Sequence, residues 1–338
     1  MDTGDYIMSY TSYRDGYAIE STFKDGTTCT AASSTAYLLG VVGDDSTLPS
    51  PEAAVHYTGT GLNAKEVAVN LLWRGQFNCR GMISVLLQNG IPIWLAMGAS
   101  STAASIHTIT PTTDGSLLPS IVWQHEEQGS ATNEEYQFLG VKVDSMLLVH
   151  DLASKERNYL MAKLEVMAGL AKDPGYALTN DPALPATSTT AAYTNLSTRT
   201  WGATSLDGLQ KVEIVVANGL TPVYTHSYDG GTYTGQWPYL FTEAQRKEYR
   251  INLTLDLNTI ERVIWDELIA TTAHSTDLVL KWTKSANDYI QLTAKDCQVV
   301  SDPKLIAAKT VKPETIILEP RALEWAVKDA IAGGSYGE

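Results

Sequence analysis

Residues 249–258 read Tyr-Arg-Ile-Asn-Leu-Thr-Leu-Asp-Leu-Asn. From Ile251 to Leu257 every second residue is apolar, and the residues between them are polar. A period of two is typical of a β-strand that turns one face to a core and the other to water or a partner. We therefore predict a strand here, and the residues that follow indicate how it is packed.

After this strand the sequence changes to the period of a helix. Asn258 is placed to cap the helix, and Glu261 supports its first turn. The apolar residues recur at intervals of three and four, so they share one helical face. These residues are Ile260, Val263, Ile264 and Leu268. We expect this face to pack on a sheet.

Two more strands follow the predicted helix. Their alternating apolar residues are Leu278, Leu280 and Trp282 in the first, and Ile290, Leu292 and Ala294 in the second. A polar turn from Ser285 to Asp288 joins them. The order strand, helix, strand, strand requires a sheet with one covered face, and its polar face must meet water or a partner.

The rest of the chain predicts mostly strands, so the expected fold class is mainly β with a short flanking helix. Alternating patterns predict strands at 67–79, 121–127, 136–149, 159–167 and 209–217, with a bulge at Gly140. Residues 82–97 are apolar on all sides, which predicts a buried segment with a short helix and a break near Gly90 and Pro92. Loops are expected at 44–64, 99–119 and 226–238.

We divide the chain into three parts. Residues 1–36 are predicted to be an N-terminal arm or extended edge, and residues 37–309 a β domain. Within that domain, residues 173–200 are of low complexity and predict an exposed connection, which would separate two halves if the domain is duplicated. Residues 310–338 are expected to be a C-terminal tail with a short helix from Pro320 to Ala330, whose apolar face would hold Leu323, Ala326, Val327 and Ala330.

Composition limits the function classes. The chain has 338 residues, and its 44% apolar and 18% charged content favours a packed core over disorder. The net charge of −14 argues against a protein that grips nucleic acid or an anionic membrane surface. No secretion signal or membrane-spanning run is expected. Cys29, Cys79 and Cys297 are widely spaced, and we expect all three to be free thiols in a reducing compartment.

The sequence holds no convincing catalytic, metal or cofactor motif. Gly59 to Ala64 fits a dinucleotide-binding pattern, but a loop precedes it and an alternating strand follows, where a helix start is required. His125, Glu126 and Glu127 are adjacent, yet in a strand only His125 and Glu127 share a face. We expect a solvated strand face there, no metal, no cofactor and no enzyme.

Four stretches resemble one known family. They are residues 16–23 (Gly-Tyr-Ala-Ile-Glu-Ser-Thr-Phe), 93–98 (Ile-Trp-Leu-Ala-Met-Gly), 136–145 with Val-Lys-Val-Asp-Ser at its end, and the strand, helix and hairpin of 251–300. In this order and spacing they resemble the tail tube proteins, or major tail proteins, of tailed phages and related viruses. The family has no catalytic residues to carry over.

The resemblance implies a β-sandwich or barrel flanked by a helix. Six copies would close into a ring, and stacked rings would form the virion tail tube through which viral DNA passes without specific binding. Its partners would be copies of itself and other tail proteins such as the tape measure, initiator and terminator, with no membrane. The protein would be found in the virion tail, and in the host cytoplasm during assembly.

An acidic lumen would repel DNA phosphates, so charged strand faces are the candidates for the lumen. Lys142 and Asp144 share one face of their predicted strand, and Lys163 and Glu165 share one face of theirs. The alternative is that these four residues lie on the outer surface.

Three other functions remain open from the sequence. One is a carbohydrate-binding β-sandwich whose exposed aromatic residues would be Tyr228, Tyr233, Trp237 and Tyr239. A second is another β-rich ring component of a virion. The third is an enzyme that uses His125 and its neighbouring carboxylates.

Overall fold

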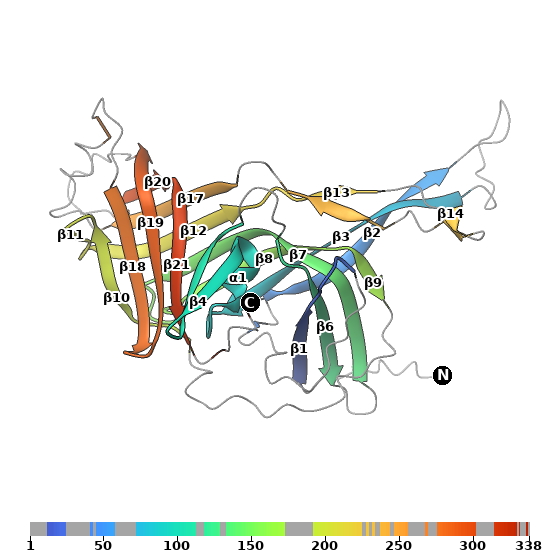
Figure 1. The fold of residues 1–338 in the computed structure, drawn as a ribbon, viewed down its shortest axis with the longest axis horizontal. Coiled ribbons are helices and arrows are strands. Elements are labelled where there is room, and N and C mark those ends of the chain that lie inside the picture. The colour runs from blue at the N-terminus through green and yellow to red at the C-terminus, as the bar shows by residue number, and fades with distance from the viewer. Residues whose placement is uncertain are drawn as a thin grey trace, which may run out of the picture.

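The computed structural model describes residues 12–24, 41–42, 45–57, 72–112, 118–128, 133–172, 192–224, 228–229, 232–233, 237–243, 247–255, 268–269, 276–301, 314–329, 331 and 336. In this part of the chain seventeen strands form one hydrogen-bonded network, and every strand pair is antiparallel. The fold is mainly β, as predicted. Figure 1 shows its layers.

The network divides into three sheets that share strands. The large sheet has the order β2 (Thr47–Tyr57), β3 (Leu72–Leu86), β8 (Met161–Ala168), β7 (Asn133–Asp151), β12 (Leu209–Ala217), β17 (Glu248–Leu255), β20 (Glu314–Glu319) and the end of β19 (Asp288–Ser301). The second sheet has the order β11 (Thr204–Ser205), β10 (Leu196–Trp201), β18 (Thr276–Ser285), β19, β21 (Ala322–Lys328), β5 (Ile106–Pro111) and β4 (Gly98–Ala103).

The small sheet has the order β1 (Ser12–Ile19), β6 (Ile121–Gln128), β7 and β9 (Leu170–Lys172). Two separate strand pairs complete the fold, namely β13 (Thr221–Val223) with β16 (Leu240–Thr242), and β14 (Tyr228–Asp229) with β15 (Thr232–Tyr233). Because β7 and β19 each belong to two sheets, the three sheets form one continuous body.

The main core lies where the second sheet crosses the large sheet (Figure 1). The alternation of the opening stretch is confirmed, since Ile251, Leu253 and Leu255 are buried and the residues between them are half exposed. The predicted hairpin is also present as β18 and β19, with Trp282 and Leu292 fully buried.

One short helix, α1 (Ile91–Met97), is buried along its whole length. Pro92 lies in its first turn, and Gly98 ends it with φ of 98°. The helix contacts β7 and β5, so it fills the space between the large sheet and the β4–β5 hairpin. The predicted break at Gly90 is therefore the start of this helix, and residues 82–86 before it belong to β3.

Gly140 forms the predicted bulge in β7. Its φ is +63°, and the register between β6 and β7 shifts between Ile121 and Trp123. A Cβ at this glycine would lie 2.6 Å from the ring of Phe23. Only glycine fits both the backbone conformation and the space.

The C-terminal helix predicted from Pro320 to Ala330 is wrong, because residues 322–328 form β21. Leu323, Trp325 and Val327 are buried, and the residues between them are half exposed. With this period of two, Trp325 lies in the core. The predicted helix had placed Trp325 outside its apolar face. Pairing with β19 on one side and β5 on the other decides the conformation.

Several predicted loops and boundaries also differ from the structure. The expected loops at 44–64 and 99–119 contain β2 and the β4–β5 hairpin. The predicted connection at 173–200 is wrong from residue 192 onward, where Tyr193 is buried and β10 pairs with β18. In contrast, residues 12–19 form strand β1, which among the described strands pairs only with β6 and is an edge of the small sheet, in agreement with the predicted extended edge. These segments are strands because they pair with other strands of the sheets. Local composition does not show such partners.

Most of the helix predicted after β17 lies outside the described residues, including Ile260, Val263 and Ile264. Leu268 and Ile269 are helical. Leu268 is half buried against the main core, and Ile269 is exposed. Within the described part of the chain, no helix has both the length and the apolar character needed to cross a membrane.

Candidate assembly surface

The large sheet turns one face to the core and its other face, here called the open face, outward. Alternation along β8, β7, β12, β17 and β20 places half-exposed or exposed residues on the open face. Its charged residues are Lys163, Glu165, Lys211, Glu213, Arg250 and Glu319, and its apolar residues are Leu147, Val149, Met161, Val215 and Ile317. Asp151 and Glu248 lie at its strand ends, so five carboxylates accompany three basic side chains.

Hydrogen bonds order two carboxylates on the open face, those of Glu165 and Glu213. The Ser145 hydroxyl donates to Glu165 Oε2 at 2.8 Å, and Lys211 Nζ lies 2.6 Å from Glu213 Oε1. Asn252 Nδ2 donates to Glu213 Oε2 at 3.1 Å. Burial alone would raise the pKa of Glu213, but these two partners outweigh it and lower the pKa. Glu213 therefore carries a full negative charge at neutral pH.

The four predicted lumen residues separate into two groups. Lys163 and Glu165 lie together on the open face, as their spacing predicts. Lys142 is buried, with 4% of its side chain exposed, and Asp144 accepts a hydrogen bond from the backbone N–H of Leu220 at 2.7 Å. Lys142 pairs with Met167, which is two residues from Glu165 on β8, so it lies toward the same face of the sheet as Glu165. This end of the face is covered, because Met167 is buried in a small apolar cluster with Leu118, Leu220 and Phe241.

Lys142 belongs to a buried charged cluster, here called the lysine junction, formed by Lys142, Glu243 and Lys247. Glu243 Oε1 lies 3.6 Å from Lys142 Nζ and accepts a hydrogen bond from the backbone N–H of Leu118 at 2.6 Å. Glu243 Oε2 lies 4.0 Å from Lys247 Nζ. Burial lowers the pKa of both lysines, and the charge of Glu243 offsets part of that effect. No pattern in the sequence connects these positions.

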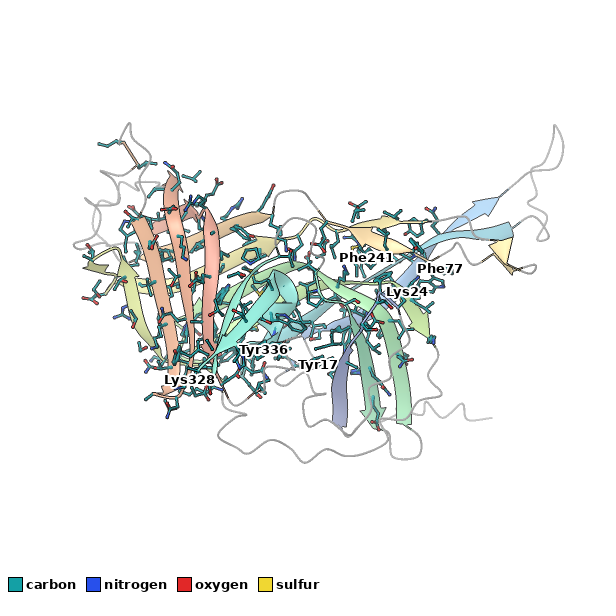
Figure 2. The ribbon with its side chains drawn as sticks, in the orientation of Figure 1. Tyr17, Lys24, Phe77, Phe241, Lys328 and Tyr336 are labelled. Atoms are coloured by element: carbon teal, nitrogen blue, oxygen red, sulfur yellow. The ribbon has the colours of Figure 1, made fainter. Side chains whose placement is uncertain are left out.

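The β2–β3 hairpin projects from the body of the molecule (Figure 1). Among the described strands, β2 pairs only with β3, so β2 is an edge of the large sheet. Pro49 and Pro51 lie in β2, and proline lacks the N–H that a central strand needs. Phe77 of β3 and Phe241 of β16 lie near the point where the hairpin joins the body (Figure 2).

Of the four aromatic residues of the carbohydrate hypothesis, the structure describes the side chains of Trp237 and Tyr239. The ring of Trp237 stacks on Phe77 with centroids 4.5 Å apart, so one of its faces is covered. Tyr239 is 61% exposed. The backbones of Tyr228 and Tyr233 pair across β14 and β15. The structure does not describe their side chains.

His125 is half buried between two carboxylates, in place of the solvated strand face that we expected. Its Nδ1 lies 2.9 Å from Asp15 Oδ1, and its Nε2 lies 3.4 Å from Glu127 Oε1. Asp15 Oδ1 also accepts a hydrogen bond from the indole N–H of Trp123 at 2.9 Å. Burial lowers the pKa of His125, but the hydrogen bonds and charges of Asp15 and Glu127 raise it by more. The contact ties β1 to β6.

Neither metal ligation nor a disulfide is found among the described residues. No group of three His, Cys, Asp or Glu side chains in that part of the chain is placed to hold a metal ion. Cys79 and Cys297 are free and buried, and burial raises the pKa of the Cys79 thiol to about 12. Cys29, the third thiol predicted to be free, lies outside the description, as does the Gly59 to Ala64 pattern.

Comparison with protein-family models gives no match for this chain, and comparison with curated proteins gives none at a significant level.

Proposed function

We propose that this chain is a structural virion protein that assembles as hexameric rings, and that stacked rings form a tail tube for viral DNA. The observation that carries the proposal is the open face. It extends across five adjacent strands of the large sheet and holds more carboxylates than basic side chains. Among the described strands, the large sheet also ends at β2, which pairs only with β3.

An open edge favours assembly for a simple reason. The unpaired N–H and C=O groups of an edge strand are a template for pairing with another chain, and a closed ring removes them. β2 is eleven residues long and stands away from the body with β3, so a neighbouring copy has access to it (Figure 1). The sandwich behind the sheet supplies a rigid wall.

The charge of the open face suits a conduit. Carboxylates repel DNA phosphates across a gap of about one Debye length, roughly 8 Å at physiological ionic strength. A lumen with a modest carboxylate excess lets DNA slide without adhesion. In this proposal the tape measure, initiator and terminator proteins are the partners, and the protein is found in the virion tail and, during assembly, in the host cytoplasm.

The test is self-association of the purified chain. We expect rings or tubes in negative-stain images and a rise in scattering mass with concentration. A proline in an edge strand has its nitrogen on the side away from the partner strand, so the N–H of Ala53, two residues after Pro51, lies on that side. Ala53→Pro removes this donor and should reduce assembly, whereas the matched Ala53→Ser should not. A strictly monomeric wild-type chain at every concentration, also with an initiator complex present, contradicts the proposal.

A further inference from the structure

The sequence Asn-Gly occurs twice in the chain, at 89–90 and at 218–219. In such a pair the backbone nitrogen of the glycine can attack the side-chain carbon of the asparagine with little hindrance, because glycine has no Cβ. A cyclic imide forms as ammonia leaves, and water opens it to aspartate or isoaspartate. Neither asparagine is exposed in the folded chain, since Asn218 is 0% and Asn89 is 6% exposed.

The turn after β12 requires both residues of its Asn-Gly pair. The side-chain Nδ2 of Asn218 donates to the carbonyl oxygens of Ala96 in α1 and Val143 in β7, both at 3.0 Å. The backbone N–H of Asn218 donates to the carbonyl of Asp144 at 2.8 Å. Gly219 has a φ of +63°, a conformation that favours glycine. The amide therefore ties this turn to α1 and β7.

The same contacts oppose imide formation in the folded chain. Nδ2 of Asn218 is the atom that must leave as ammonia, but it is bonded to two buried carbonyls. Negative charge develops on Oδ1 during the attack, and within the described part of the chain no donor reaches that buried atom. The three hydrogen bonds also restrict the rotations that the attack needs. Unfolding removes all of these restraints.

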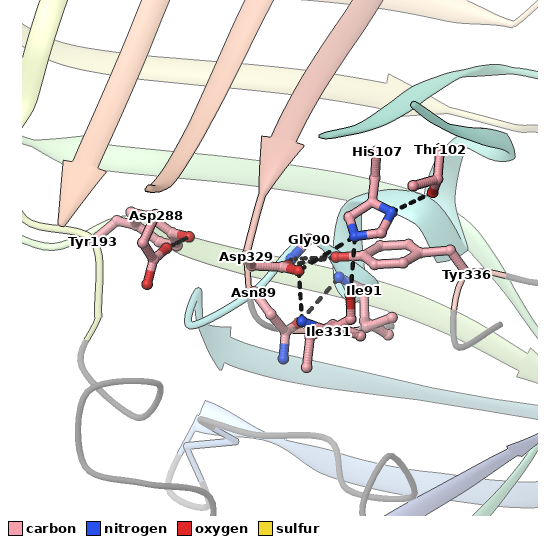
Figure 3. Close-up of polar contacts among 10 residues, drawn as sticks. All are labelled: Asn89, Gly90, Ile91, Thr102, His107, Tyr193, Asp288, Asp329, Ile331 and Tyr336. Carbon is pink, nitrogen blue, oxygen red and sulfur yellow. Dashed lines mark hydrogen bonds and ion pairs between the residues drawn. The ribbon is translucent and has the colours of Figure 1, made fainter. Parts of the chain in front are cut away.

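The product of the reaction does not fit the folded site. A carboxylate has no hydrogen to donate, so the carbonyls of Ala96 and Val143 would meet a buried negative charge. Isoaspartate, in addition, lengthens the main chain of the turn by one carbon atom. At Asn89 the contact is of the opposite kind, because its Oδ1 accepts a hydrogen bond from the backbone N–H of Ile91 at 3.0 Å (Figure 3). An aspartate oxygen can accept that bond equally well.

We propose that Asn218 and Gly219 form a deamidation site that the fold keeps closed, and that its conversion in an unfolded chain prevents that chain from refolding. The Gly219 nitrogen bonds to Cγ of Asn218, the Cγ–Nδ2 bond breaks, and Nδ2 leaves as ammonia with the proton of the glycine nitrogen. Water then adds to one of the two imide carbonyls and opens the ring. The reaction consumes one water molecule and needs no other reagent. This inference does not rest on ring assembly.

The main test follows the wild-type full chain in native buffer and in guanidinium chloride at the same mildly alkaline pH. Mass spectrometry after digestion at mildly acidic pH measures conversion at 89 and 218. Position 218 should convert at least tenfold more slowly in the native chain than in the denatured one. After refolding of a partly converted pool, the folded fraction should carry at least tenfold less conversion at 218 than the pool. Equal rates, or equal conversion in pool and folded fraction, overturn the proposal.

A second test compares the same chemical change at the two sites. Asn218→Asp and Asn89→Asp are each refolded from denaturant, so neither needs to be folded at the start. The folded yield of Asn218→Asp should be at least tenfold below that of the wild type, whereas Asn89→Asp should stay within twofold of it. A wild-type yield of Asn218→Asp overturns the proposal. Equal losses in the two variants do so as well, because the loss would then not come from the two carbonyls at Asn218.

Discussion

Strand β7 supplies polar residues to two places that differ in their contact with water. Lys142 enters the lysine junction, where it is almost completely buried beside Glu243. Three residues later, Ser145 lies on the open face and donates to exposed Glu165. Lys142 pairs with Met167 and Ser145 pairs with Glu165, two residues away on the same face of β8, so the two environments differ in what covers them. Met167 is covered by a small apolar cluster with Leu118, Leu220 and Phe241. The same short stretch of sequence thus serves an interior ion cluster and an outer surface.

The contribution of a charged side chain to stability therefore depends on its partners and on how deeply it is buried. A pair of exposed charges contributes about 0 to 1 kcal/mol, because water already solvates both groups. A buried ion that loses its partner costs about 3 to 5 kcal/mol, because no water replaces the lost charge. The lysine junction is therefore a structural feature, and the open face is free to serve an external function.

The largest expected effect is the loss of Glu243. Glu243→Ala leaves Lys142 and Lys247 buried without their carboxylate and should lower the free energy of unfolding by about 3 to 5 kcal/mol. The matched change Glu165→Ala on the open face should cost about 0.5 kcal/mol or less. Denaturant unfolding of the three proteins measures both values. Equal effects would remove the distinction between the two regions.

The pH dependence of the same variant sharpens the comparison. Burial lowers the pKa of both lysines below the ordinary value of 10.5, so the unfolded chain binds their protons more readily than the folded chain. Stability from these groups therefore rises as the pH rises toward 10.5. In Glu243→Ala the lysines lose the charge that raised their pKa, so this rise should begin at a lower pH.

Local alternation in the sequence was enough to predict one hairpin between strands that are close along the chain and the inward faces of regular strands. The β18–β19 hairpin and the inward residues of β12 and β17 follow from a period of two. Trp325 was misjudged because Leu323, Ala326 and Val327 also fit a helix, and only pairing with β5 and β19 excludes it. Short apolar segments carry this ambiguity in general.

The candidate surface was predictable only in part for the same reason. Lys163 and Glu165 lie on a regular strand, so their shared exposed face follows from spacing alone. Lys142 lies two residues after the Gly140 bulge and pairs with Glu243, a hundred residues away in the sequence. The local sequence pattern predicts neither how deeply a strand residue is buried nor which distant residue is its counter-ion.

A smaller effect is expected at His150, which lies in the interior. The indole N–H of Trp282 donates to its Nδ1 at 2.8 Å, and its Nε2 donates to Asn158 at 2.8 Å. His150→Leu leaves that indole N–H without a partner and should cost about 1 to 3 kcal/mol. Trp282→Phe in the same variant should recover part of the loss, as a double-mutant cycle would measure.

The wild-type pH dependence at His150 provides a second check. Burial lowers its pKa below the ordinary 6.5, so the folded chain binds this proton less readily than the unfolded chain. Stability from this group is therefore lost as the pH falls below 6.5. An unfolding series from pH 7.5 to 5 should show a weaker acid loss in His150→Leu than in the wild type.

His125 should respond to pH with the opposite sign and a smaller amplitude, about 0.5 to 1 kcal/mol. Asp15 and Glu127 raise its pKa above 6.5, so its stabilisation is complete below 6.5 and is lost as the pH rises through the folded value. His125→Gln should reduce the loss of unfolding free energy that the wild type shows as the pH rises above 6.5. NMR titration of the two imidazole rings separates the sites, and a His125 pKa below that of His150 would contradict at least one of the two predicted directions.

The smallest expected effect on stability, and the most informative one for function, is a charge reversal on the open face. Glu165 and Glu319 are both exposed, and neither belongs to the lysine junction. Asp144 is unsuitable, because it holds the backbone of Leu220 and lies 3.7 Å from Arg80. We therefore choose the pair Glu165→Lys and Glu319→Lys, which should change the free energy of unfolding by about 0.5 kcal/mol per site or less.

If the open face lines a DNA channel, this pair converts a weakly repelling wall into an attracting one. Genome ejection from virions that carry the double change should be slowed at low ionic strength and restored at high salt, because salt weakens contacts with phosphate. The control is Asp207→Lys, at a side chain that is 82% exposed in the turn before β12. It makes the same charge change as each single substitution of the pair, away from the open face, and should leave ejection unaltered. Tails of normal length with unaltered ejection at both salt concentrations would mean that the open face does not meet the DNA, because a charge reversal in a narrow channel acts directly on a polyanion within one Debye length.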